Sequence, residues 1–196
     1  MSRSESPNLS CDCTAAAEVD RSRRRVIRIA VAGMAAPLAV ASRPAAAAVN
    51  GDFLVEEDAE GAPVPLLATD LKPGRPVLAF PFDAQAGKRR DETRLNKIVL
   101  IRLPESEMST ATRERAAGGV VAYSAICTHQ ACDVKTWLSK EKALVCFCHS
   151  SKFALLNNGE VVGGPATRAL PAVPLRLEGE RLVIAGGFSA DPGGNA

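Results

Sequence analysis

Aromatic residues are scarce in this chain of 196 residues, where they make up 4% of the total. Proteins that bind single-stranded nucleic acid stack bases on aromatic side chains, so this composition argues against such a platform. A strong charge of one sign is missing as well. The net charge is +2, and the excess of Lys and Arg lies in residues 1–48, which leaves the remaining chain close to neutral. A protein that binds phosphate backbones needs a clustered basic face, so we expect no nucleic-acid partner.

Long hydrophobic runs are missing too, which bears on the N-terminal segment. Its apolar stretch, residues 29–41, has 13 residues including Pro37, whereas a membrane-spanning helix needs about 20. A basic segment precedes it, and residues 22–28 read Ser-Arg-Arg-Arg-Val-Ile-Arg, which resembles the twin-arginine export signal. Small residues follow at 45–48, as before a peptidase cleavage site. We therefore predict a twin-arginine-type signal over residues 1–48 and a periplasmic protein that is exported in its folded state.

Two other uses of the same segment remain open. A retained signal would let residues 26–48 contact the inner membrane or anchor in it, and the basic residues can also form a linker before a buried helix. Cleavage near Ala47 or Ala48 would remove Cys11 and Cys13, which makes these cysteines weak candidates for a metal site. The exported protein would reach an oxidising compartment, where disulfides persist.

Short apolar runs punctuated by Gly and Pro characterise the rest of the chain and favour strands over helices. We predict an N-terminal approach segment over residues 49–75, a main domain over residues 76–190 and a flexible tail over residues 191–196. Strands are expected at residues 77–82, 97–103, 120–124, 144–147 and 152–156. An all-β fold, either an antiparallel sandwich or a small barrel, accommodates them.

Turn residues predict two hairpins. Asn157-Asn158-Gly159 can supply the positive φ angles of a tight turn. Glu178-Gly179-Glu180 separates two strands of alternating polarity, residues 175–177 and 182–184. The polar segment 105–117 is expected to form a loop or a short helix, and so are residues 133–143, which contain the single Trp and several charges.

Cysteine and histidine gather in one short stretch of the chain. Both histidines, His129 and His149, and four of the six cysteines lie within residues 127–149. Residues 127–132, the first box, read Cys-Thr-His-Gln-Ala-Cys, and residues 146–151, the second box, read Cys-Phe-Cys-His-Ser-Ser. Scattered core cysteines would not cluster in this way, so the stretch predicts a site built on thiol and imidazole chemistry.

Three kinds of site suit this cluster. Structural zinc binds two Cys and two His, but its common modules pair like ligands at wider spacing, and here two more cysteines remain. Two disulfides with two incidental histidines would suit an exported domain, but they leave unexplained why each box carries one His shortly after a Cys. The third is an iron–sulfur cluster held by both residue types.

The paired boxes, Cys-x-His and Cys-x-x-His, resemble those of Rieske [2Fe–2S] proteins. The resemblance implies one cluster per chain, with two thiolates on one iron and two imidazoles on the other: Cys127 and Cys146, then His129 and His149. It also implies a disulfide between Cys132 and Cys148, as in the subgroup related to quinol-oxidising complexes. The expected fold is a Rieske-like antiparallel β-sandwich or small barrel whose cluster-binding subdomain is formed by two loops. The resemblance is firm over residues 119–171 and weaker over residues 75–118.

Histidine ligands change what such a cluster can do. Two ferric ions, two sulfides and two thiolates sum to a neutral oxidised cluster, whereas four thiolates would make it doubly negative. A neutral centre accepts an electron more readily, so the resemblance implies a potential in the range of roughly −150 to +300 mV. With both histidines bound to iron, no Ser/His/Asp set remains, and the chain shows no phosphate loop. We therefore expect an electron-transfer subunit without a complete active site of its own.

Residues around the boxes are expected to tune that potential. Ser151 matches a family serine whose hydroxyl donates to a bridging sulfide, and Phe153 stands where high-potential members have a tyrosine. Ser150 occupies a position that is usually Gly and is expected to distort its loop, because non-Gly residues tolerate positive φ poorly. Gly164 and Pro165 resemble the Gly-Pro loop that covers the cluster on a third side. Together these residues imply an intermediate potential, below that of members with both Ser and Tyr.

Two family contexts suit the chain. Residues 119–126 read Gly-Val-Val-Ala-Tyr-Ser-Ala-Ile and look like the small subunit of arsenite oxidase, an exported Rieske protein bound to a molybdopterin subunit. The Gly-Pro loop, Ser151 and a retained anchor would suit the Rieske subunit of a quinol–cytochrome c reductase, whose partner is cytochrome b. A free-standing carrier and a non-redox domain that kept the fold are further alternatives. In the redox contexts the expected acceptor is a cytochrome c or a copper protein.

Overall fold

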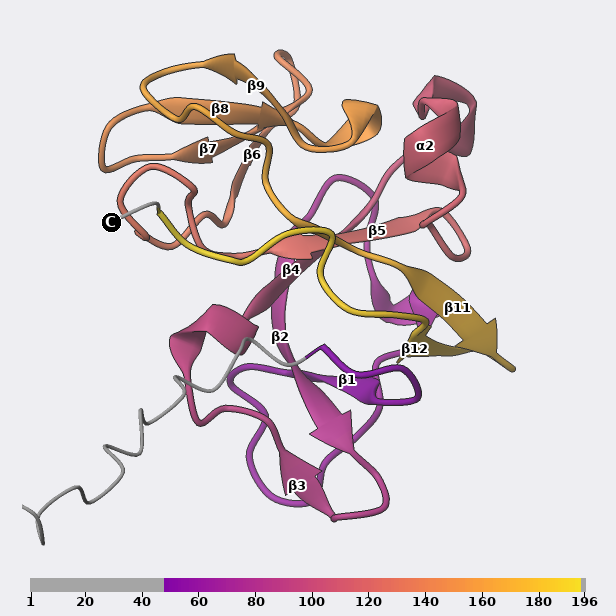
Figure 1. Cartoon of the computed structure of the whole chain (residues 1–196). Coiled ribbons are helices and arrows are strands. Elements are labelled where there is room, and N and C mark those ends of the chain that lie inside the picture. The colour runs from indigo at the N-terminus through magenta and orange to yellow at the C-terminus, as the bar shows by residue number, and fades with distance from the viewer. Residues whose placement is uncertain (1–47, 195–196) are drawn as a thin grey trace, which may run out of the picture. The chain divides into compact units, whose positions relative to one another are not determined.

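Residues 48–194 are described in the computed structural model of this protein (Figure 1). The predicted signal, and with it the predicted membrane contact, falls outside this part of the chain apart from Ala48. Within residues 48–194 no helix has both the length and the apolar character that a membrane crossing requires. Strands dominate the regular structure and form two antiparallel sheets, which confirms the predicted all-β class.

The larger sheet has eight strands. Seven follow one another in the order β10-β5-β4-β2-β1-β12-β11, and β3 pairs with β2. The strands are β1 (Phe53–Glu56), β2 (Val77–Asp83), β3 (Lys88–Arg89), β4 (Ile98–Arg102), β5 (Val120–Ser124), β10 (Ala172–Val173), β11 (Leu175–Glu178) and β12 (Arg181–Ile184). The pairing of β11 with β12 confirms the hairpin at residues 178–180. Because β1 lies between β2 and β12, the segment expected to lead up to the domain supplies a strand of its sheet.

The smaller sheet holds the second box. Its order is β6-β7-β8-β9, with β6 (Thr136–Leu138), β7 (Ala143–Cys146), β8 (Ser151–Ala154) and β9 (Glu160–Gly163). Thr136–Leu138 pairs with β7 as an edge strand, so the loop or helix predicted for residues 133–143 is wrong for these three residues, whereas residues 139–142 form a turn. The strand signal was weak there because β6 has three residues, none of them fully buried.

Short helical turns occupy the connections. They are η1 (Ala68–Asp70), η2 (Arg94–Asn96), η3 (Glu105–Glu107), α2 (Thr110–Arg113) and η4 (Leu155–Asn157). α2 begins after Ser109, whose hydroxyl accepts a hydrogen bond from the Thr112 N–H as an N-cap, and it confirms the short helix predicted within residues 105–117. Asn158 and Gly159 have φ angles of 53° and 71°, as predicted, but η4 makes their connection longer than a tight hairpin turn.

Strands β4 and β5 separate two hydrophobic cores. Side chains alternate across a strand, so Val99 of β4 lies in one core and its neighbour Ile98 lies in the other. The core around Val99 also contains residues of β7 and β8, together with Cys127 and Cys146. The smaller sheet and both boxes therefore pack on one face of β4 and β5 (Figure 1).

Candidate metal centre

The second box forms the turn between β7 and β8. Cys146 is the last residue of β7 and is buried, whereas His149 is exposed and Phe147 is 73% exposed. Ser150 has a φ angle of 59°, yet Cys146 stays paired with Ser151 across the turn. The expected distortion at Ser150 is therefore absent from this pairing. The serine adopts the left-handed conformation that Gly would favour, at a cost of roughly 1–2 kcal/mol.

The first box is a compact loop that follows β5. The N–H of Cys127 donates to the Cys132 carbonyl at 2.8 Å, and the N–H of Ala131 donates to the Cys127 carbonyl at 3.0 Å. Ala131 also has a left-handed backbone, with a φ angle of 56°. These bonds close the loop on itself, so that Cys127 is buried while His129 is half-buried.

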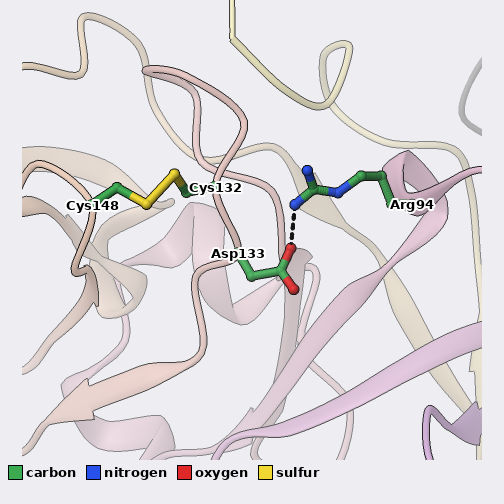
Figure 2. Close-up of a disulfide and its surroundings, with 4 residues drawn as sticks. All are labelled: Arg94, Cys132, Asp133 and Cys148. Atoms are coloured by element: carbon green, nitrogen blue, oxygen red, sulfur yellow. Dashed lines mark hydrogen bonds and ion pairs between the residues drawn. A yellow bond between two sulfur atoms is a disulfide. The ribbon is translucent and has the colours of Figure 1, made fainter.

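The two boxes meet. A disulfide joins Cys132 of the first box to Cys148 of the second, with 6.6 Å between their Cα atoms (Figure 2), which confirms the pairing that the resemblance implied. The imidazole rings of His129 and His149 lie with their centroids 4.8 Å apart, at an angle of 85°. Each box therefore contributes one imidazole to the same small region of the molecule.

Two thiols remain free at this junction. Cys127 and Cys146 are both buried and outside the disulfide, so the alternative with two disulfides is wrong. Burial raises the pKa of the Cys146 thiol, and the adjacent Cys127 thiol raises it further. The N–H groups of Cys148 and His149 act against this rise in the pKa of Cys146. A buried thiolate needs a compensating cation, so two such thiols on loops that also carry two imidazoles fit a cluster with mixed ligands.

A third loop, which follows β9, contacts the second box. A Cβ atom on Gly164 would lie 2.5 Å from the Ser150 carbonyl oxygen and 2.5 Å from the Ser151 Cα, and the φ angle of Gly164 is +81°. Only Gly allows this approach. The N–H of Ala166 donates to Oγ of the fully buried Ser151 at 3.2 Å, and Pro165 is exposed. The loop therefore supports the backbone of the second box directly.

Charged residues that the sequence did not single out hold the end of the first box. Asp133, next to Cys132, contacts Arg94 Nη2 at 2.5 Å (Figure 2) and Lys97 Nζ at 3.0 Å. Lys97 Nζ also contacts Glu57 Oε1 at 2.6 Å. Burial alone would lower the pKa of Lys97, but its two carboxylate partners outweigh burial and raise that pKa. Burial likewise opposes the lowered pKa of Asp133, which its two cationic partners produce.

Lys97→Met is expected to lower the free energy of unfolding by about 2 kcal/mol, because it leaves two partly buried carboxylates, Glu57 and Asp133, without their shared cation. The stability that the lowered pKa of Asp133 provides is present above the ordinary value of 3.8 and is lost as the pH falls through the native pKa. The difference between the variant and the unsubstituted protein should therefore shrink in acid. Urea unfolding of the apoproteins measures this difference in the free energy of unfolding.

Lys88→Met is the control, because the exposed ion pair of Lys88 with Glu92 contributes less than about 0.5 kcal/mol to the free energy of unfolding. Equal losses of unfolding free energy in both variants would contradict the prediction.

Comparisons with known proteins give the family that this domain resembles. Residues 80–174 match the Rieske [2Fe-2S] domain family. The chain is 34% identical over 170 residues to the putative respiratory nitrate reductase subunit Rieske of Haloferax mediterranei, covering 84% of this chain and 73% of that protein. It is 33% identical over 138 residues to the cytochrome bc1 complex Rieske iron-sulfur subunit of Streptomyces lividans, and the match covers 67% of this chain and 79% of that protein. The cytochrome bc1 complex Rieske iron-sulfur subunit of Corynebacterium diphtheriae is 35% identical to this chain over 106 residues. That match covers 52% of this chain but only 26% of the relative's own length.

An all-β domain whose two facing loops carry free thiols, imidazoles and a bridging disulfide defines an iron–sulfur electron-transfer protein. The chain belongs to the Rieske [2Fe–2S] family. Membership implies one [2Fe–2S] cluster per chain and electron transfer of the Rieske type. This sets aside the interpretation as a structural zinc site.

Proposed function

We propose that the cluster is held by two thiolates on one iron and two imidazoles on the other: Cys127 and Cys146, then His129 and His149. The observation that carries this assignment is the meeting of the two boxes, where free buried thiols accompany imidazole rings with centroids 4.8 Å apart. The other two cysteines of the boxes are used by the disulfide. When bound, the cluster supplies one-electron transfer at a potential of roughly −150 to +300 mV.

The proposed site has one side buried in the protein core and another exposed to solvent. Cys127 and Cys146 lie in the core on the face of β4 and β5, which excludes water from the sulfur ligands. His149 is exposed, and so is Phe147 in the same turn. We therefore infer that an electron partner meets the chain at the imidazole side, where His149 is exposed and the apolar ring of Phe147 is available for packing.

We further propose that the chain is the small subunit of an exported oxidoreductase whose larger catalytic subunit is of the molybdopterin type, as in arsenite oxidase. The relative from Haloferax mediterranei, which is matched over most of its length, is named as a subunit of a respiratory nitrate reductase. That name supports a context outside bc1 complexes. Phe153, in place of the tyrosine of high-potential members, supports the same context. A cytochrome c or a copper protein would then be the acceptor.

The second candidate is the Rieske subunit of a membrane quinol–cytochrome c reductase, with cytochrome b as the partner. The relatives from Streptomyces lividans and Corynebacterium diphtheriae, both named as bc1 subunits, favour it. The fully buried Ser151 and the close approach of Gly164 to it also suit this candidate.

Purification of the native complex, followed by an EPR-monitored redox titration, tests these proposals. Molybdenum that co-purifies in proportion to the chain, with a moderate midpoint, supports the first candidate. Haem b that co-purifies, with a strongly positive midpoint, supports the second and contradicts the first. Full signal in a chain that purifies alone would favour a free-standing carrier. Iron-loaded protein without the lowered average g value of a nitrogen-ligated [2Fe–2S] cluster would refute the ligand assignment.

Phe153→Tyr is expected to raise the midpoint potential, because the added hydroxyl can donate to a ligand sulfur and so stabilise the reduced state. Phe153 is fully buried in the core that contains both free cysteines. A hydrogen bond that strengthens by about 0.5–1.5 kcal/mol on reduction corresponds to roughly 20–60 mV for one electron. Phe80→Tyr, at another buried ring on β2, is the control and should leave the midpoint unchanged. An unchanged midpoint in Phe153→Tyr would show that this hydroxyl does not tune the site.

A further inference from the structure

The end of the described chain lies against the first box. Arg168, in the connection between β9 and β10, donates from Nη1 to the Asp191 carbonyl at 2.9 Å and from Nη2 to the Gly193 carbonyl. Figure 1 shows the C-terminal segment running from β12 back toward the loops that follow β5. Residues 191–194 therefore make defined contacts where the sequence predicted part of a flexible tail.

Two glycines let this segment touch the backbone of the box. A Cβ atom on Gly194 would lie 2.4 Å from the His129 carbonyl oxygen and 3.3 Å from the Gln130 Cα. Gly193 is buried, has a φ angle of +94°, and its added Cβ would lie 4.0 Å from the Ala131 Cβ. A side chain at Gly194 would push the segment away, so the Gly-Gly pair is what allows the segment to cover the box at His129.

Arg168 reaches the first box through its own backbone as well. Its carbonyl accepts a hydrogen bond from Oγ1 of Thr128 at 2.8 Å. Thr128 is 3% exposed and lies between two of the proposed ligands, Cys127 and His129. One residue therefore ties the connection between β9 and β10 both to the first box and to residues 191–194.

We propose that Arg168 and residues 191–194, here called the tail clamp, position the first box and keep water from His129, and that they thereby set the potential of the site. The inference rests on the proposed role of His129 as a ligand. Arg168 is a positioning residue in this scheme, because its guanidinium holds two carbonyls as a fork that the single ammonium of Lys cannot reproduce. Water that enters beside the cluster stabilises the more negative, reduced state. A loosened clamp should therefore raise the midpoint.

Two variants that leave the net charge unchanged test the tail clamp. Arg168→Lys removes the pair of guanidinium hydrogen bonds to the tail carbonyls, and Gly194→Val displaces residues 191–194 from the first box. Arg176→Lys on β11 and Gly187→Ala are the matched controls, the latter because its added Cβ makes ordinary contact at 3.7 Å. Hydrogen exchange of the amides in the first box and an EPR-monitored redox titration are measured on the cluster-loaded protein.

The expected result has two parts. The amides of Cys127 and Ala131, which are hydrogen-bonded within the loop, should exchange at least about tenfold faster in both test variants, and the midpoint should rise, while both controls match the unsubstituted protein. Unchanged exchange in both test variants would overturn the proposal, and so would faster exchange with an unmoved midpoint. Failure of the ligand assignment is distinguishable, because the unsubstituted protein would then lack the nitrogen-ligated EPR signal.

Discussion

Cys127→Ser and Cys146→Ser are each expected to yield protein without a [2Fe–2S] cluster. A serine hydroxyl ionises far above neutral pH and does not supply the thiolate that iron requires. The neighbouring sulfurs, those of Cys132 and Cys148, are held in a disulfide and are not available as replacements. Iron content and the EPR signal should fall on the order of tenfold or more, since even changes beyond the ligands cost 10–100-fold in metal affinity.

The disulfide supplies the matched control. With Cys132→Ser and Cys148→Ser combined, all four proposed ligands remain, so the cluster should still assemble and give its EPR signal. The chain-entropy model assigns about 3 kcal/mol to a loop of this length, and the apoprotein should lose up to that amount of unfolding free energy. In the loaded protein the loss should be smaller, because the cluster links the same two loops. Loss of the cluster in this double variant, equal to that in the single ligand variants, would contradict the assignment.

Counting free thiols separates the two pairs without relying on the cluster. In iron-free protein that is denatured without reductant, Cys127→Ser and Cys146→Ser should each lower the number of labelled thiols by one. Cys132→Ser should raise it by one, because the Cys148 thiol is released from the disulfide. The opposite signs hold whatever the state of the two cysteines in residues 1–48. A change of the same sign in all of these variants would show that the structure pairs the cysteines wrongly.

The sequence predicted those strands and turns that are determined by residues close together in the chain. β4 was predictable because its apolar residues supply two cores through simple alternation, as Ile98 and Val99 do. The two boxes indicated a cluster site because their Cys and His spacing resembles that of Rieske proteins. The turn of β11 into β12 was predictable because Gly179 supplies the positive φ. β6 was missed, since three half-buried residues carry little periodicity.

Contacts between distant segments could not be predicted in the same way. Lys97 precedes an apolar strand and Asp133 follows a cysteine, and nothing in either neighbourhood indicates that Lys97 Nζ and Asp133 Oδ2 meet at 3.0 Å. Arg168 and Gly193 likewise become partners only once the sheets have folded. The sequence therefore indicated the four residues that we propose as cluster ligands, but it did not indicate the contacts that hold their loops in place.

Gly164→Ala is expected to damage the site nearly as severely as loss of a ligand. The added Cβ would meet backbone, at 2.5 Å from both the Ser150 carbonyl oxygen and the Ser151 Cα, where no flexible side chain can yield. The φ angle of +81° adds roughly 1–2 kcal/mol of strain for a non-Gly residue. Relief requires the loop after β9 to move away from the second box, which breaks the hydrogen bond from Ala166 to Ser151. We expect a loss of about 3 kcal/mol or more in unfolding free energy.

Gly163→Ala, at the adjacent position, is the matched control for Gly164→Ala. A Cβ on Gly163 would meet only the Lys152 side chain, at 3.6 Å or beyond, and no left-handed φ is involved. Gly163→Ala should therefore keep its iron and lose less than about 1 kcal/mol, although the two variants differ by one position. Iron per chain and urea unfolding of the apoprotein measure both. If Gly164→Ala retained full iron and the stability of Gly163→Ala, the loop after β9 would not shape the second box, and the covering role implied for Gly164 and Pro165 would fall with it.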